Sequence, residues 1–210
     1  MTTKYFSPNK IVIYVSLLSA ALITALFISH THKPETPILN PDDGTIFSLA
    51  REIKPFNLVS DKGETFKLNN FYNHWTLLFF GFTHCENVCP TTLSILNRTY
   101  RKLETIYPNL QVVLISLDPE RDNPNALASY VRAFNPQFIG VSGKISELRK
   151  LQSQLGIFSA RDNTAKNYQI QHTSSVFLIN PKGEWSGMFR FGLNPERLSQ
   201  DVITSVKALS

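Results

Sequence analysis

The chain has 210 residues, which is enough for one domain of ordinary size and an appendage. Hydrophobic residues make up 42% of it and include 15 Phe, so a substantial core can form. The net charge of +5 comes partly from Lys4, Lys10 and Lys33, which precede the first acidic residue, Glu35. No run of Lys and Arg interleaved with aromatic residues follows, and we therefore expect no nucleic-acid partner.

The first apolar run, residues 11–28, reads IVIYVSLLSAALITALFI and contains no charged side chain. A helix of this length would extend about 27 Å, close to the thickness of a bilayer core. No small-x-small cleavage site follows it, which favours a transmembrane anchor over a cleaved signal peptide. Lys4 and Lys10, against Lys33 alone, favour a cytoplasmic leader at residues 1–10 and an exported domain. The simplest setting is a bacterial inner membrane, with one span and the soluble domain in the periplasm.

Residues 29–51 hold a Pro-rich stretch and a turn cluster, and they predict a tether. From residue 52 to residue 210 the pattern becomes that of one compact α/β domain. The continuous apolar runs WTLLFFGF and LQVVLISL are typical of strands that are covered on both faces. In chain order we expect a β-hairpin (56–60 and 65–68), a strand (75–82), a helix that Pro108 ends, a strand (110–117), helices (124–134 and 145–155), a second hairpin (176–180 and 185–191) and an amphipathic helix (195–208).

This order predicts an extended thioredoxin-like α/β fold with an N-terminal β-hairpin extension, preceded by one transmembrane helix. Sites in such sheets lie at the carboxyl edge of the parallel strands. The segment SLDPERDNP follows the second central strand at that edge. We expect its Asp118 and Asp122 to cap a turn and the helix that opens at Pro124, rather than to hydrogen-bond the cysteine loop.

The only two cysteines, Cys85 and Cys89, lie four residues apart in GFTHCENVCP, between a predicted strand and a predicted helix. A purely structural disulfide would close a very short loop and so stabilise the domain little. In one functional interpretation the pair cycles between dithiol and disulfide, because a helix N-terminus lowers the pKa of a nearby thiol. In the other, both thiolates bind one soft metal ion, with Cu(I) preferred over harder cations. A structural zinc site normally requires a fourth protein ligand, and no further cysteine exists.

Three separated blocks carry a resemblance: GFTHCENVCP (81–90), SLDPERDNPNALASYVRAF (116–134) and IQHTSSVFLINPKGEW (170–185). Together they resemble the Sco/SenC family, membrane-anchored copper proteins that assist the assembly of cytochrome c oxidase. The resemblance implies copper ligation by Cys85, Cys89 and a third ligand, His172. It implies as partners the copper-receiving subunit of a terminal oxidase and other periplasmic copper carriers; it leaves open whether Cu(II) binds as well as Cu(I). The chain departs from the family at Glu86-Asn87, usually Pro-Asp, and at Gln171, commonly Asp.

His84 competes with His172 for the position of third ligand. Consecutive residues in a turn tend to point apart, so chelation by His84 together with the adjacent cysteine is strained. In thioredoxin-like folds the loop before the late hairpin lies against the cysteine loop, which also favours His172. We expect His74 to cap or solvate the start of the first central strand, and His30 and His32 to be interfacial or solvated.

The functional prediction is a membrane-anchored copper metallochaperone rather than an enzyme. The alternative is a thiol–disulfide oxidoreductase, in which Cys85 and Cys89 are a redox-active pair that reduces the acceptor's cysteines or senses redox state. Resemblance to thioredoxin-type oxidoreductases would imply a CxxC motif and a cis-proline facing it. Here the spacer is one residue longer, and residues 173–175 are Thr-Ser-Ser. The missing proline suits a histidine ligand better than disulfide exchange with a protein substrate.

Overall fold

A computed structural model describes residues 14, 17–19, 21, 24, 44–162, 168–192 and 194–209. The chain divides into two compact units, Met1–Thr36 and Pro37–Ser210. The described residues of the first unit are helical, whereas the predicted leader, most of the predicted anchor and the predicted tether up to residue 43 lie outside the described residues. Within the ranges that are described, no helix is both long enough and apolar enough to cross a membrane.

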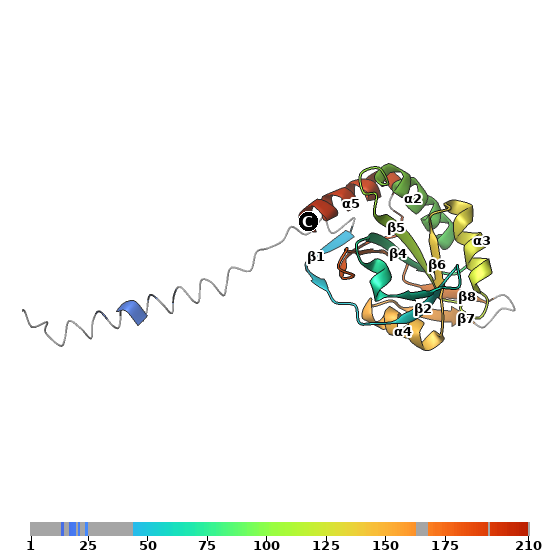
Figure 1. The fold of residues 1–210 in the computed structure, drawn as a ribbon, viewed down its shortest axis with the longest axis horizontal. Helices are drawn as coiled ribbons and strands as arrows, with labels where there is room; N and C mark the ends of the chain where they lie inside the picture. Colours follow the sequence, from blue (N-terminus) through green and yellow to red (C-terminus); the bar gives the residue numbers. More distant parts are fainter. Residues whose placement is uncertain are drawn as a thin grey trace, which may run out of the picture. The chain divides into compact units, whose positions relative to one another are not determined.

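The second unit is built on an eight-stranded sheet with the strand order β1-β10-β9-β4-β5-β6-β2-β3 (Figure 1). Its two central strands, β4 (Trp75–Gly81) and β5 (Leu110–Ser116), pair in parallel over their whole lengths. Both strands therefore end at the same edge, which we call the cysteine edge because the cysteine loop follows β4. The other strands are β1 (Gly44–Arg51), β2 (Asn57–Ser60), β3 (Thr65–Lys67), β6 (Ile139–Ser142), β9 (Val176–Ile179) and β10 (Trp185–Phe189).

Helices cover both faces of the sheet, as predicted from its continuous apolar strands. Leu77 and Phe79 of β4 pack on one face, in the core formed with α2 (Val88–Leu103), α3 (Pro124–Phe134) and α5 (Pro195–Leu209). Leu78 and Phe80 pack on the other face, in the core formed with α4 (Ile145–Gln154) and the 3₁₀ turn η1 (Leu68–Phe71). Alternate residues of one strand thus enter different cores, which explains why its sequence is apolar without interruption.

Most predicted elements are confirmed, including the N-terminal hairpin of β2 and β3 and the helix that begins at Pro124. The predicted C-terminal limit of the tether, residue 51, is wrong because residues 44–51 form β1, an edge strand paired with β10. Gly187 permits this pairing, since a Cβ there would lie 2.5 Å from Ile46 Cδ1 and 2.6 Å from the Thr45 carbonyl oxygen. The helix after the cysteines ends at Leu103, before Pro108.

Besides β1, two further features made of short strands escaped prediction. Strand β6 pairs in parallel with β5, so that α3 is the crossover between them. Strands β7 (Ser159–Asp162) and β8 (Gln169–His172) form a separate two-stranded sheet, with Ser159 opposite His172. We call these two strands the histidine hairpin. They are mostly polar and none of their residues is buried, so they lack the apolar pattern that identifies a strand in sequence.

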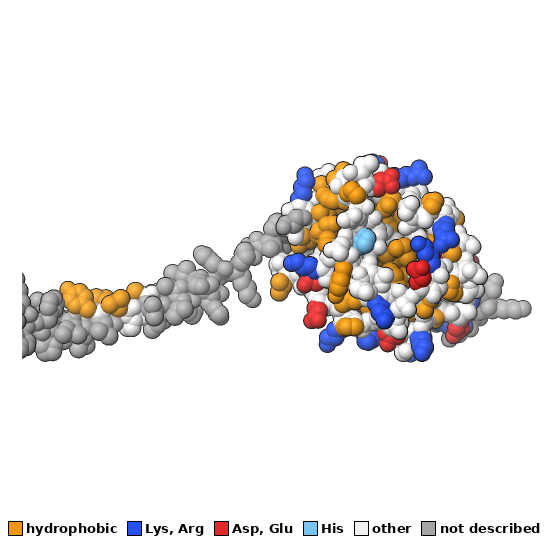
Figure 2. All heavy atoms as spheres, viewed as in Figure 1, with side chains coloured by type: hydrophobic (Ala, Val, Ile, Leu, Met, Phe, Trp, Pro, Cys, Tyr) orange, Lys and Arg blue, Asp and Glu red, His pale blue; other side chains and the backbone are white. Residues whose placement is uncertain are grey.

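The surface of the domain carries charges of both signs. On the face shown in Figure 2, Lys and Arg side chains alternate with Asp and Glu, and hydrophobic side chains lie among them.

Candidate metal centre

The two cysteines lie at the cysteine edge, one in the loop after β4 and one in the first turn of α2. Both are free thiols; Cys85 is partly exposed and Cys89 is buried. The Cys89 backbone N–H donates to Cys85 Sγ at 3.3 Å, as expected for a sulfur at a helix N-terminus. Gly81 makes room for the second sulfur, because a Cβ there would lie 3.0 Å from Cys89 Sγ. A side chain at the end of β4 would therefore crowd the Cys89 sulfur, which would have to move by a few tenths of an ångström.

His172 is the last residue of β8, and its ring points at the sulfurs. Its Nε2 lies 3.7 Å from Cys89 Sγ, while its Nδ1 lies 2.9 Å from the Thr173 carbonyl oxygen. A carbonyl only accepts hydrogen bonds, so Nδ1 carries the proton and the lone pair of Nε2 faces the cysteines. The rings of Phe79 and Phe82 contact the imidazole edge-on, at centroid distances of 6.2 and 6.1 Å. The tautomer and the orientation are thus those of a metal ligand.

The ligand atoms of Cys85, Cys89 and His172 all lie within 4.8 Å of one another. In the part of the chain that the structure describes, this is the one group of three or more Cys, His, Asp or Glu residues with such spacing. A cavity of about 450 Å³ opens onto the group. Glu86 and Gln171, where the sequence departs from the family pattern that it resembles, both line that cavity. The substitutions therefore lie at the mouth of the site and leave the three candidate ligands in place.

His84 is not part of this group, although it adjoins the first cysteine. Its side chain is 53% exposed, and its Nδ1 lies 2.9 Å from Thr83 Oγ1. The structure thus brings together the three predicted ligands and leaves the competing histidine outside. His30 and His32 lie outside the described residues.

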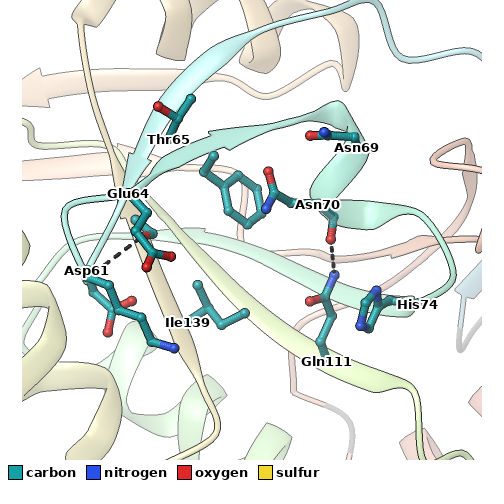
Figure 3. Close-up of a pocket in the computed structure, with 11 residues that line it drawn as sticks. Asp61, Glu64, Thr65, Asn69, Asn70, His74, Gln111 and Ile139 are labelled. Atoms are coloured by element: carbon teal, nitrogen blue, oxygen red, sulfur yellow. Dashed lines mark hydrogen bonds between the residues drawn. The ribbon is translucent and has the colours of Figure 1, made fainter.

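His74 lies at the opposite edge of the sheet, directly before β4. It lines a second cavity of about 300 Å³ (Figure 3). There Nδ1 of His74 donates to the Tyr72 carbonyl at 2.8 Å, and Gln111 Nε2 donates to the Asn70 carbonyl at 3.0 Å. These bonds hold the start of β4 and β5 against η1, as expected for a residue that caps the strand.

The two thiols differ in their affinity for a proton. The pKa of Cys85 is lowered to about 4, chiefly by its hydrogen bond with Cys89, whereas burial opposes the shift. The pKa of Cys89 is raised, first by the same hydrogen bond and then by burial. In the metal-free reduced pair the accessible sulfur therefore carries the negative charge, and the buried sulfur keeps the proton.

Asp122 fastens the cysteine loop, which corrects the expectation that it caps a turn. Its carboxylate is buried and accepts hydrogen bonds from the Thr83 backbone N–H at 3.2 Å and from Ser116 Oγ at 2.7 Å. Burial raises the pKa of Asp122, and these hydrogen bonds oppose the increase. The side chain that caps α3 is that of Asn123, whose Oδ1 accepts from the Ala126 N–H. Sequence alone did not separate the two roles, because Asp and Asn both suit turns and helix caps.

Asp118 was likewise expected to cap a turn, and it instead contacts the histidine hairpin. Its buried carboxylate accepts a hydrogen bond from the Tyr168 hydroxyl at 2.7 Å and pairs with Arg121. Its backbone N–H donates to Ser116 Oγ at 2.9 Å. The loop that follows β5 is therefore tied both to the cysteine loop and to the hairpin that ends in His172.

Comparison with known proteins agrees with this geometry. The sequence model of the SCO1/SenC family matches residues 47–207. An SCO2-like protein of Rickettsia prowazekii is 31% identical over 197 residues, which cover 91% of this chain and 94% of that protein. The structure of Arabidopsis thaliana ScoI with copper bound is similar at a TM-score of 0.70, with 27% identity over 73% of this chain and 97% of that one. Yeast Sco1 with copper bound has a TM-score of 0.68 and 25% identity, over 77% and 90% of the two chains. The expected α/β fold is confirmed.

The asymmetry of the thiols predicts how they react with iodoacetamide. In the reduced chain, the alkylation rate of Cys85 should stay high at pH 6 and fall as the pH decreases through about 4, because only the thiolate is nucleophilic. Cys89 should react slowly throughout, as it is buried and protonated. Mass spectrometry of the wild type and of Cys85→Ser measures both rates. A midpoint near pH 8.5 for Cys85, the value of an ordinary thiol, would contradict the assignment.

The role of Asp122 predicts a loss of stability in Asp122→Asn. An amide cannot accept from every donor that faces the carboxylate, so the free energy of unfolding should fall by about 1–3 kcal/mol. Glu64→Gln is the matched control, because Glu64 is exposed and its change should stay within about 0.5 kcal/mol. Urea unfolding of the three proteins provides the measurement. Equal stabilities would show that Asp122 does not hold the cysteine loop.

Proposed function

The chain belongs to the SCO1/SenC family, and we propose that it is a membrane-anchored copper metallochaperone that assists assembly of the copper centre of cytochrome c oxidase. One observation carries the proposal: two sulfurs and one imidazole nitrogen lie within 4.8 Å of one another at the mouth of a cavity. Relatives with the same fold, from Arabidopsis thaliana and yeast, have been solved with copper bound. Copper is the cargo in this proposal, rather than a resident cofactor.

The donor set of Cys85, Cys89 and His172 fits Cu(I). Thiolates are soft ligands that favour Cu(I), and imidazole binds copper through a neutral nitrogen. Nε2 of His172 already faces the sulfurs without a proton. Three protein ligands leave the ion open to an incoming ligand, so a thiolate of the acceptor can take it over. A square-planar Cu(II) complex would require a further ligand from the solvent side.

The proposed acceptor is the copper-receiving subunit of a terminal oxidase, and the proposed donors are other periplasmic copper carriers. The resemblance of the three sequence blocks to Sco/SenC proteins supports these partners. An anchor at residues 11–28 and a cytoplasmic leader at residues 1–10, supported by apolarity and lysine placement, would hold the domain at the outer face of a bacterial inner membrane. In that compartment a reduced dithiol and its disulfide can both exist.

A thiol–disulfide oxidoreductase is the second candidate, and the unequal thiols favour it. Cys85 is an accessible thiolate and can attack a disulfide, which forms a mixed disulfide and releases one thiolate of the substrate. Cys89 passes its proton to that thiolate and then attacks the Cys85 sulfur, which releases the second substrate thiolate and leaves a Cys85–Cys89 disulfide. In this role the enzyme would reduce the acceptor's cysteines before they bind metal, or sense redox state. The reduced pair is also the form that binds metal, so the two roles are compatible.

The chaperone proposal predicts about one copper ion retained per reduced chain, as expected for a single three-ligand site. His172→Ala should weaken Cu(I) binding more than about 100-fold, because losing a ligand costs more than losing its supporting contacts. His84→Ala is the matched control and should change the affinity little, since His84 is exposed, bonds to Thr83 and is not part of the group of three ligands. Competition with a chromophoric Cu(I) chelator measures the affinities. Absence of copper from the reduced, loaded wild type would overturn the proposal.

Complementation separates the two candidate functions. In a host that lacks this protein and needs it for oxidase activity, both His172→Ala and Cys89→Ser should abolish activity if copper transfer is the essential role. A purely redox role requires the cysteines alone, so His172→Ala should then retain activity. The measurement is oxidase activity in membranes, with immunoblots to confirm equal amounts of each variant.

A further inference from the structure

Tyr168 lies between two arginines, immediately before the strand that ends in His172. The guanidinium carbon of Arg121 is 3.6 Å from the centre of its ring, and that of Arg161 is 3.5 Å from the same centre. Each distance is well within the range of a cation–π contact. The hydroxyl of Tyr168 donates to Asp118 Oδ1 at 2.7 Å. Two guanidinium groups and one buried carboxylate thus hold the side chain of Tyr168.

The partners of Tyr168 are themselves fixed. Arg121 pairs with the buried Asp118, and its Nη2 donates to the Tyr168 carbonyl at 3.1 Å. Arg161 pairs with Glu120 at 2.9 Å. The ring, the hydroxyl and the carbonyl of Tyr168 thus all contact residues of the loop after β5 or of the neighbouring strand β7. We call this set of residues, Asp118, Glu120, Arg121, Arg161 and Tyr168, the tyrosine clasp.

The histidine hairpin has few other ties to the domain. It is a two-stranded sheet that is separate from the eight-stranded one, and such a hairpin is marginally stable alone. A cavity of about 440 Å³ lies between the hairpin and α4. The cavity of the metal centre is lined by β8, the second strand of the hairpin. Ile170 packs against the cores, and Ser159 Oγ donates to Gln152 Oε1 at 2.9 Å. Gln169 Nε2 also donates to the His84 carbonyl at 3.2 Å, which joins the hairpin directly to the cysteine loop. The clasp adds a second connection, which runs through the loop after β5.

That connection is continuous. From Tyr168 it passes to Asp118, then to Ser116 Oγ through the Asp118 N–H, and on to Asp122, to which Ser116 donates at 2.7 Å. Asp122 accepts from Thr83, two residues before the first cysteine. The two halves of the metal centre are thus held to one loop by hydrogen bonds to two buried carboxylates, and hydrogen bonds to a carboxylate are stronger than those between neutral groups.

We propose that Tyr168 is a positioning residue for the third ligand: the tyrosine clasp holds His172 at the distance from the sulfurs that copper requires. The proposal rests on the proposed copper function and adds a residue to it. Tyr168 acts only through His172 and does not contact the metal. Its removal should therefore loosen the hairpin and weaken copper binding, with no further effect once the imidazole is gone.

The test compares Tyr168→Leu and Tyr168→Phe in the full-length chain, with Tyr72→Phe as the control on a partly exposed tyrosine far from the site. Tyr168→Leu should weaken Cu(I) binding by about 10- to 100-fold, as is usual for contacts that support a metal ligand. Tyr168→Phe keeps the ring between the guanidinium groups and should cost about 3- to 10-fold, since it removes one hydrogen bond. Tyr72→Phe should bind as the wild type does.

The same substitutions in a His172→Ala background give a double-mutant cycle. There, Tyr168→Leu should change the affinity less than about twofold, because the ligand on which it acts is absent. An equal loss in both backgrounds, or no loss in the wild-type background, would overturn the proposal. If Tyr168→Leu does not fold, as judged by circular dichroism, Tyr168→Phe decides by the same criteria.

Amide hydrogen exchange on the metal-free protein provides a measurement that does not depend on copper. Tyr168→Leu should speed exchange in β7 and β8 while β4 and β5 exchange as in the wild type. Unchanged exchange in the hairpin would overturn the positioning role. If the wild type binds no copper but the hairpin loosens as expected, the copper function fails while the clasp is upheld.

Discussion

The constraint on which the rest of the structure depends is that three ligands from two distant segments must meet before any metal is present. The sulfurs follow β4, and the imidazole ends a hairpin that begins more than 70 residues later. Neither segment belongs to the interior of the eight-stranded sheet. Two buried carboxylates position these segments. Asp122 accepts a hydrogen bond from the cysteine loop, and Asp118 accepts one from Tyr168, directly before β8. They lie in one short loop, so the two halves share a single point of support.

The chemistry of the centre follows from how protons are distributed within it. Cys85 is ionised, Cys89 keeps a proton and His172 presents a lone pair. Coordination by both sulfurs requires the proton of Cys89 to leave, so metal affinity is linked to pH. The same distribution suits disulfide exchange, in which the ionised sulfur attacks first and the protonated sulfur reacts in a later step. Metal binding and thiol chemistry are therefore two uses of one arrangement, and oxidation of the pair removes both sulfur ligands together.

The sequence predicted the parts of the fold that apolar patterns and Pro residues mark. The central strands and the helix opening at Pro124 were found because both signals are local. Strand β1 was missed because it follows a Pro-rich stretch, and the histidine hairpin because its residues are polar. Cys85 and Cys89 were found from their spacing, whereas His172 depended on family resemblance. The roles of Asp122 and Tyr168 had no sequence signal, since their partners are tertiary contacts.

The register of β1 has a consequence for how the domain is held. Gly44 lies opposite Phe189, Phe189 opposite Val176, and Val176 opposite Phe79, only two residues before the end of β4. Three strand spacings of about 4.8 Å separate Gly44 from β4 along one edge. The chain thus enters the domain at the edge that bears the sulfurs. The anchor proposed above would then join the domain close to the sulfurs, so the length of the connecting segment would limit how far the metal centre can reach from the membrane.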